Sequence, residues 1–277
     1  MTPLIASVAL AWACAPQAFA SSAFETTPSA ALSEAAPPTT TVPATITPSP
    51  GETTPTVTPW SARSIGRSVR GRPIRAYRFG AGKRRLLVIG GVHGNEWGDN
   101  VALALVRALK ARPSLVPSGT EVHVIAVLNP DGVARNTRGN ARRVDLNRNL
   151  PTGNWRTQLS RRDPSRRAGL TGGTRSGSEP ETAALLRYAS PKRFAAVVAL
   201  HSRGGFISPS GPGSRTLAAR IGKPSGLPLG HVGYDSVITG SMGRYFSVNQ
   251  RIPIVTIELK SPTMSSGLRD GIARCLR

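Results

Sequence analysis

The segment RRLLVIGGVHGNEWGDN, residues 84–100, joins a strand pattern to a helix pattern through a glycine-rich turn. Its first part, RRLLVIGGVHG, is an apolar run that ends in glycines, as is typical of a buried strand. The apolar spacing of residues 95–113 then predicts a helix that stops at Pro113. The turn between the two elements carries an imidazole and a carboxylate, His93 and Glu96, three residues apart.

Further strand and helix patterns follow along the chain. Residues 121–132 (EVHVIAVLNPDG) predict a second strand closed by a turn at 129–132, and residues 194–202 and 252–260 predict two more strands. Residues 179–190 predict a helix with acids in its first turn, where the helix dipole favours them. Strands that alternate with helices indicate an α/β fold: a mixed, mostly parallel twisted sheet flanked by helices, in a single catalytic domain.

Polar residues stand at the ends of these predicted strands. His93 and Glu96 follow the first strand, His201 ends the third and Glu258 lies at the end of the fourth. Ligands of such folds gather at the carboxyl ends of the strands. A catalytic zinc site typically has three His or Glu ligands and one open position, which His93, Glu96 and His201 can provide. We therefore predict a zinc site made by these three residues.

The two other histidines of the domain are weaker candidates for metal ligands. His123 alternates with apolar residues inside a predicted strand, which is typical of a packed sheet residue. His231 follows GLPLG and is expected in a loop.

Glu258 is a lone acid in a strand of Val, Ile and Leu, where an unpaired carboxylate is costly. One interpretation is a structural salt bridge with Lys260 or an arginine. The interpretation that we favour is a general base that activates a water and then protonates a leaving amine.

An arginine- and asparagine-rich segment lies between the second strand and the second helix. Asn147 and Arg148 offer donors suited to a carboxylate, and Arg138 is a candidate for stabilising a developing oxyanion. Several other arginines lie close to Arg138, so solvent exposure is a serious alternative for that residue. We expect the polar, basic loop at 152–178 to form a rim near the pocket.

Five short motifs, in chain order, carry a family resemblance: HGNE, NPDG, VDLNRNLP, ALHS and TIEL. Together they resemble the zinc carboxypeptidase family of the carboxypeptidase A type. The segment IGRSVRGRPIRAYRFG before GGVHGNE is most similar to the bacterial murein peptide amidase branch of that family. The similarity runs from about Ile65 to the end of the chain.

The resemblance implies a function for each matching position. It implies one zinc ion on the three residues named above, Glu258 as catalytic base and acid, and Arg138 as the group that polarises the carbonyl. Asn147 and Arg148 match the pair that holds the terminal carboxylate of the substrate. A mobile tyrosine of the family is matched best by Tyr234, with Tyr245 as the alternative.

The first 59 residues differ in composition from the rest. Residues 1–20 predict a signal peptide with a small-residue cleavage pattern, and an uncleaved membrane anchor is the alternative. Residues 21–59 are rich in Pro and Thr, which predicts a disordered linker. The catalytic domain is then 60–277, and the expected location is secreted or associated with the cell envelope. With the signal removed, Cys275 would have no cysteine partner.

The charge of the domain restricts its partners. All 36 Lys and Arg residues follow position 62, which gives that region a formal charge of about +25. An anionic cell-wall polymer is a possible partner, while no nucleic-acid-binding motif is present and no nucleic acid is expected. Contact with a membrane is expected only if the N-terminal segment is retained.

Three hypotheses for the function remain. The preferred one is a zinc-dependent exopeptidase that hydrolyses the bond before a C-terminal residue, namely the γ-D-glutamyl-diaminopimelate bond of murein peptides. In that case Arg244, which follows Gly240 and Ser241, can pair with the second carboxylate of diaminopimelate, and exposure to solvent is the alternative for this arginine. The alternatives are a general metallocarboxypeptidase acting on ordinary peptides and, with less support, a catalytically silent wall-binding module.

Overall fold

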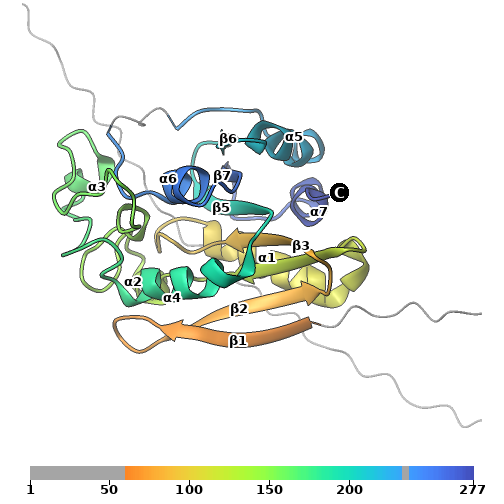
Figure 1. Ribbon diagram of the computed structural model, residues 1–277, viewed down its shortest axis with the longest axis horizontal. Helices are drawn as coiled ribbons and strands as arrows, with labels where there is room; N and C mark the ends of the chain where they lie inside the picture. Colours follow the sequence, from red (N-terminus) through yellow and green to blue (C-terminus); the bar gives the residue numbers. More distant parts are fainter. Residues whose placement is uncertain (1–59, 233–236) are drawn as a thin grey trace, which may run out of the picture. The chain divides into compact units, whose positions relative to one another are not determined.

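Strand β3 (Arg84–Ile89) lies at the centre of a seven-stranded sheet in the computed structural model, which describes residues 60–232 and 237–277 (Figure 1). The strand order is β1-β2-β4-β3-β5-β7-β6. The other strands are β1 (Trp60–Arg67), β2 (Pro73–Gly80), β4 (Thr120–Ile125), β5 (Ala196–Ser202), β6 (Phe206–Ser210) and β7 (Ile254–Leu259). Strands β4, β3, β5 and β7 run parallel, whereas β1, β2 and β6 pair antiparallel.

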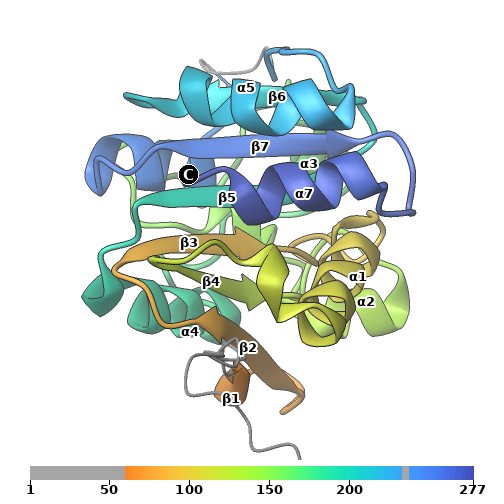
Figure 2. The same ribbon diagram turned by 90° about the vertical axis from the view of Figure 1, so that its right-hand side faces the viewer.

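Helices cover both faces of the sheet (Figures 1 and 2). The α-helices are α1 (Gly98–Ala111), α2 (Pro130–Arg135), α3 (Pro164–Arg167), α4 (Pro180–Ala189), α5 (Ser214–Ser225), α6 (Met242–Arg244) and α7 (Ser266–Arg274). Single turns of other helix types are η1 (Pro113–Leu115), η2 (Leu146–Arg148), η3 (Ser190–Lys192) and η4 (Tyr245–Asn249). The predicted mixed α/β sheet flanked by helices is confirmed.

The apolar run of β3 supplies both halves of the core. Leu86 and Val88 belong to the cluster that contains α1, α5 and α7, whereas Leu87 and Ile89 belong to the cluster that contains α4. Successive side chains of a strand point to opposite faces, so a strand covered on both sides must be apolar throughout. This explains why β3 has no alternation of polar and apolar residues.

Three strands were not predicted. Strands β1 and β2 form a hairpin at one edge of the sheet, and β6 is the other edge. Most side chains of β1 are exposed and β6 contains Pro209, so neither has the apolar pattern of a buried strand. The predicted turn at 129–132 is instead the start of α2, where the Asn129 side chain accepts a hydrogen bond from the Gly132 amide at 2.8 Å.

The register of the parallel strands brings distant parts of the chain to one edge. Strand β5 pairs with both β3 and β7, and His201 lies directly opposite Glu258 in the β5–β7 ladder. The turn after β3 leaves the sheet at the same edge. His123 lies within β4, is buried, and hydrogen-bonds Tyr188 and Glu121, so it is the packed sheet residue that was predicted.

Some predictions concern residues outside the described ranges. The signal peptide and linker predicted at 1–20 and 21–59 lie there. Within 60–232 and 237–277, no helix combines the length and apolar character needed to cross a bilayer. Cys275 is buried as a free thiol, and burial raises its pKa to about 12.

Gly90 provides a test of the close packing at the end of β3. A Cβ atom at this position would collide with the Gly98 carbonyl oxygen and lie 2.6 Å from the Ala102 Cβ. We expect Gly90→Ala to lower the free energy of unfolding by about 1–3 kcal/mol because backbone must move. The matched control is Gly153→Ala, where a Cβ would meet open space. Equal urea midpoints for the two variants would contradict this packing.

Candidate metal centre

The turn after β3 is fixed by contacts with the segment that begins α2. Gly94 packs so closely on the Gly132 backbone that a Cβ would overlap it, and its amide donates to the Thr137 carbonyl at 2.9 Å. The Asn129 side chain donates to the Val92 carbonyl at 3.3 Å. These bonds set the path of the turn and direct its imidazole and carboxylate to the sheet edge.

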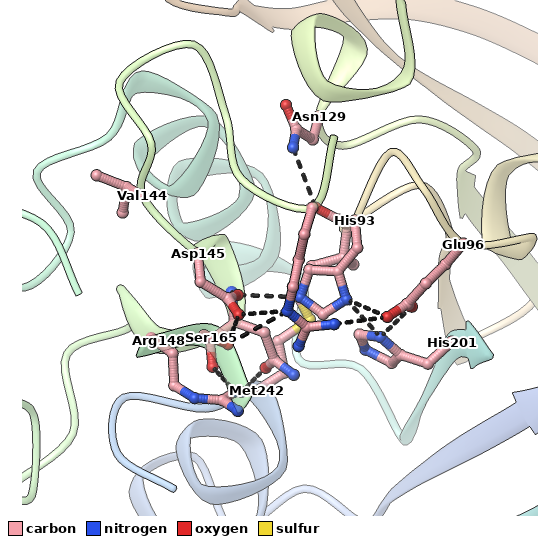
Figure 3. A network of polar contacts seen from close by, with 12 residues as sticks. His93, Glu96, Asn129, Val144, Asp145, Arg148, Ser165, His201 and Met242 are labelled. Carbon is pink, nitrogen blue, oxygen red and sulfur yellow. Dashed lines mark hydrogen bonds and ion pairs between the residues drawn. The ribbon is translucent and has the colours of Figure 1, made fainter. Parts of the chain in front are cut away.

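His93, Glu96 and His201 converge on one point (Figure 3). One ligand atom from each of them lies within 4.8 Å of the others. His93 Nδ1 is 2.7 Å from Glu96 Oε1, His201 Nδ1 is 2.9 Å from Glu96 Oε2, and the two Nδ1 atoms are 3.2 Å apart. Two nitrogens on a tetrahedral zinc, each at about 2.0–2.1 Å, are roughly 3.3 Å apart, so this donor set fits zinc.

Asp145 supports the metal group from behind. Its carboxylate accepts a hydrogen bond from His93 Nε2 at 2.9 Å. A proton on Nε2 leaves the Nδ1 lone pair free to face a metal, and a carboxylate in this position makes the imidazole a stronger ligand. Besides Glu96, the site therefore contains Asp145, the carboxylate that accepts the N–H of a metal-binding histidine.

The electrostatics of the site favour a cation. Burial would raise the pKa of Glu96, but the neighbouring His93 and His201 rings hold it well below its ordinary value. Burial would lower the pKa of His93, but the carboxylates of Glu96 and Asp145 raise it. The same negative surroundings that favour a proton on this imidazole also favour a divalent metal ion.

Arg138 points into the site. Its Nη1 donates to Glu96 Oε1 at 2.8 Å, and its Nε donates to Asp145 at 3.1 Å and to Ser165 at 3.2 Å. The side chain is 24% exposed, so it can reach a substrate while two carboxylates hold it in place. The alternative of a solvent-facing arginine does not describe this residue.

Glu258 faces the same cavity from β7. Burial raises the pKa of its carboxyl group, although the nearby His201 opposes the shift. The carboxylate has no salt bridge with Lys260 or with an arginine of the described residues, so the structural interpretation of this acid is not supported. A half-buried carboxylate with a raised pKa is suited to accepting and releasing a proton.

Arg148 is buried, and its principal partner was not predicted. Its Nε and Nη2 donate to Asp163 at 2.6 and 3.2 Å, and its Nη1 donates to the Asn147 carbonyl at 2.8 Å. A guanidinium has five N–H donors, so one N–H on each terminal nitrogen remains for a further acceptor. Asn147 holds its own position by accepting from the Met242 amide at 2.8 Å.

One cavity of about 850 Å³ is lined by the His-Glu-His group together with Arg138, Asn147, Arg148 and Glu258. Arg244 lies on its wall and is exposed. The predicted tyrosine, Tyr234, lies outside the described residues. The alternative, Tyr245, is buried in the core against Phe246 and does not line this cavity.

Sequence reasoning missed Asp145, Asp163 and Ser165. Asp163 and Ser165 lie in and before α3, in the loop that was expected only to form a rim near the pocket. The available signal was the scarcity of acids, since the domain has 11 acidic and 36 basic residues. Each buried acid therefore has many candidate basic partners. Spacing alone could not identify the partner, because Asp163 follows Arg148 by 15 residues through an irregular loop.

Comparison with known proteins identifies the class. The family model for zinc carboxypeptidase (peptidase family M14) matches residues 56–219. The chain belongs to this family, and it is a zinc-dependent hydrolase. The zinc predicted from the sequence is the metal of this family, and the His-Glu-His group is positioned to hold a metal ion.

Several individual relatives within this family are murein peptide amidases. The chain is 32% identical to murein peptide amidase A of Vibrio campbellii over 212 residues, which are 74% of this chain and 81% of the relative. It is 33% identical to murein peptide amidase A of Escherichia coli strain K12 over 194 residues, 68% and 76% of the two chains. The crystal structure of murein-tripeptide amidase from Escherichia coli O157 superposes with a TM-score of 0.62 at 28% identity, covering 79% of this chain and 96% of that one.

Asp145 supplies a test of the metal group. We expect Asp145→Asn to weaken zinc affinity about 10–100-fold, because the amide is a poorer acceptor for His93 Nε2. The measurement is zinc competition against a chromophoric chelator. The matched control, Asp131→Asn, removes another buried carboxylate, one that is held by Arg72 instead of a metal-group residue. Unchanged zinc affinity in Asp145→Asn would contradict the supporting role.

Proposed function

We propose that the chain is a murein peptide amidase that hydrolyses the bond between γ-D-glutamate and diaminopimelate. The observation that carries the proposal is a single cavity that combines a His-Glu-His group, an independent carboxylate and arginines with unused donors. The similarity to two proteins named murein peptide amidase A supports this substrate class.

We assign the zinc ion to His93, Glu96 and His201. When bound, zinc would supply Lewis acidity toward the scissile carbonyl and toward water. Asp145 keeps the His93 ring oriented, and its bond to Arg138 fixes the guanidinium beside the metal group.

Glu258 is the proton carrier in this proposal. Its carboxylate accepts a proton from the attacking water and later donates it to the leaving amine, for which burial and the raised pKa are suitable. Arg138 directs N–H groups at the carbonyl oxygen, where negative charge develops in the transition state. Both side chains act in a cavity that also holds the metal group.

The terminal carboxylate of the substrate is assigned to Asn147 and Arg148. Because Asp163 and the Asn147 carbonyl use three donors of Arg148, its two remaining N–H groups can donate to one carboxylate. The clamp restricts cleavage to the last residue, since a substrate without that carboxylate leaves these donors unpaired. Arg244, on the cavity wall, is assigned to the second carboxylate of diaminopimelate. Tyr234 remains a proposal as the mobile tyrosine.

We also propose export of this enzyme to the cell envelope or the medium. The signal-peptide pattern at 1–20, the linker composition at 21–59 and the high positive charge of 60–277 support a location next to an anionic wall polymer. Sequencing of the mature N-terminus from a secreting host tests this, with a new terminus after Ala20 expected. An intact Met1 in a cytosolic fraction would contradict it.

The substrate is tested with purified residues 60–277 loaded with zinc. L-Ala-γ-D-Glu-meso-diaminopimelate is incubated beside a series of hippuryl dipeptides, and released amine is measured with and without chelator. We expect zinc-dependent release of diaminopimelate. Release from the dipeptides alone would identify a general carboxypeptidase, and no release from a zinc-loaded protein would favour a wall-binding module.

Glu258→Gln tests the proton carrier. We expect kcat on the tripeptide to fall about 10²–10⁴-fold, because an amide cannot take the proton from water. Zinc stoichiometry should stay at one, since Glu258 is not part of the metal group. A variant that retains zinc and wild-type kcat would exclude Glu258 as the base.

A further inference from the structure

Arg203 is an unassigned arginine at the rim of the cavity. It follows His201 by two residues, is exposed and lines the cavity. Its guanidinium carbon lies 4.6 Å from the centre of the Trp97 ring. An arginine stacked on an aromatic face is partly immobilised, so it is already ordered for a ligand.

The backbone around Arg203 is tied to the metal group. The Trp97 amide donates to Ser202 Oγ at 3.2 Å, and the Ser202 amide donates to Glu96 Oε2 at 3.3 Å. On the other side, the Gly205 amide donates to the Glu258 carbonyl at 2.6 Å. The residue is therefore held between the turn that carries Glu96 and the strand that carries Glu258.

The charge of Arg203 is not balanced within the described part of the chain. Arg138 pairs with Glu96 and Asp145, and Arg148 pairs with Asp163, whereas Arg203 forms no ion pair with a described carboxylate. It is thus a cavity arginine whose N–H groups are available to a ligand, and the chemistry that suits it is a carboxylate.

Its position relative to Arg148 sets which part of a substrate it meets. Arg148 and Asp145 lie on one side of His93, and Glu96 and His201 lie on the other (Figure 3). Arg203 continues from His201 and rests on Trp97, which follows Glu96. A substrate with its terminal carboxylate on Arg148 and its scissile carbonyl at the metal group therefore extends its acyl part toward Arg203.

We propose that Arg203, stacked on Trp97, forms an anionic subsite that binds a carboxylate on the acyl side of the scissile bond. This inference rests on the proposed function, in which that group is the free α-carboxylate of the γ-linked D-glutamate. An ordinary peptide with a neutral residue there has no such group. The subsite therefore distinguishes γ-D-glutamyl substrates from general carboxypeptidase substrates.

The test compares two tripeptides and three arginine variants of the full chain. One substrate is L-Ala-γ-D-Glu-meso-diaminopimelate, and the other has a carboxamide in place of the D-glutamate α-carboxylate. We expect the wild type to favour the acid about tenfold in kcat/KM, and Arg203→Gln to remove that preference by slowing only the acid. Arg203→Lys should retain part of the preference. Arg215→Gln, an exposed arginine of α5 outside the cavity, should leave both rates unchanged.

The other outcomes distinguish failure of the Arg203 subsite from failure of the proposed function. Equal rates of the wild type on the two substrates would overturn the subsite and leave the proposed function intact. A similar loss on both substrates in Arg203→Gln would overturn it too, because it would show a purely structural role. Release from neither substrate would overturn the proposed function, and the inference with it.

Discussion

The buried carboxylate of Asp145 accepts hydrogen bonds from four groups: His93 Nε2, Arg138 Nε, Ser165 Oγ and the Asn147 amide. A carboxylate without such partners in the interior would be strongly destabilising, so the segments that supply them must meet around it. The turn after β3, the segment that carries Arg138 and Asn147, and the start of α3 are thereby brought together. The orientation of the His93 ring and of the Arg138 guanidinium depends on this one anion.

The arginines of the cavity have two kinds of surroundings. Arg138 and Arg148 are paired with carboxylates of the chain and keep only part of their donors for a ligand. Arg203 and Arg244 lie exposed at the cavity and have no carboxylate partner among the described residues. The paired arginines are held in fixed positions, whereas the unpaired ones contribute net positive charge that attracts anions. A ligand with several carboxylates can bind to arginines of both kinds. Arg203 and Arg244 thus place unbalanced positive charge at the cavity.

The central strands and the metal group could be predicted because their signals are local. β3, β4, β5 and β7 are apolar runs, and the polar residues at their ends identify the edge where they meet. The edge strands β1 and β6 could not be predicted, since an edge strand needs no continuous apolar pattern. The pairings of Asp163 with Arg148 and of Arg203 with Trp97 depend on how irregular loops return to the sheet, and no spacing in the chain encodes that path.

The residues of the site are far apart along the chain but meet at one edge of the sheet, from His93 in the turn after β3 to Glu258 on β7. Such parallel pairings close large loops and are slow to form. No stretch of the polypeptide shorter than residues 93–258 contains all of these residues, so the site forms only where these strands pair. Activity therefore requires the β3–β5–β7 ladder to be assembled, so the topology of the sheet couples catalysis to complete folding.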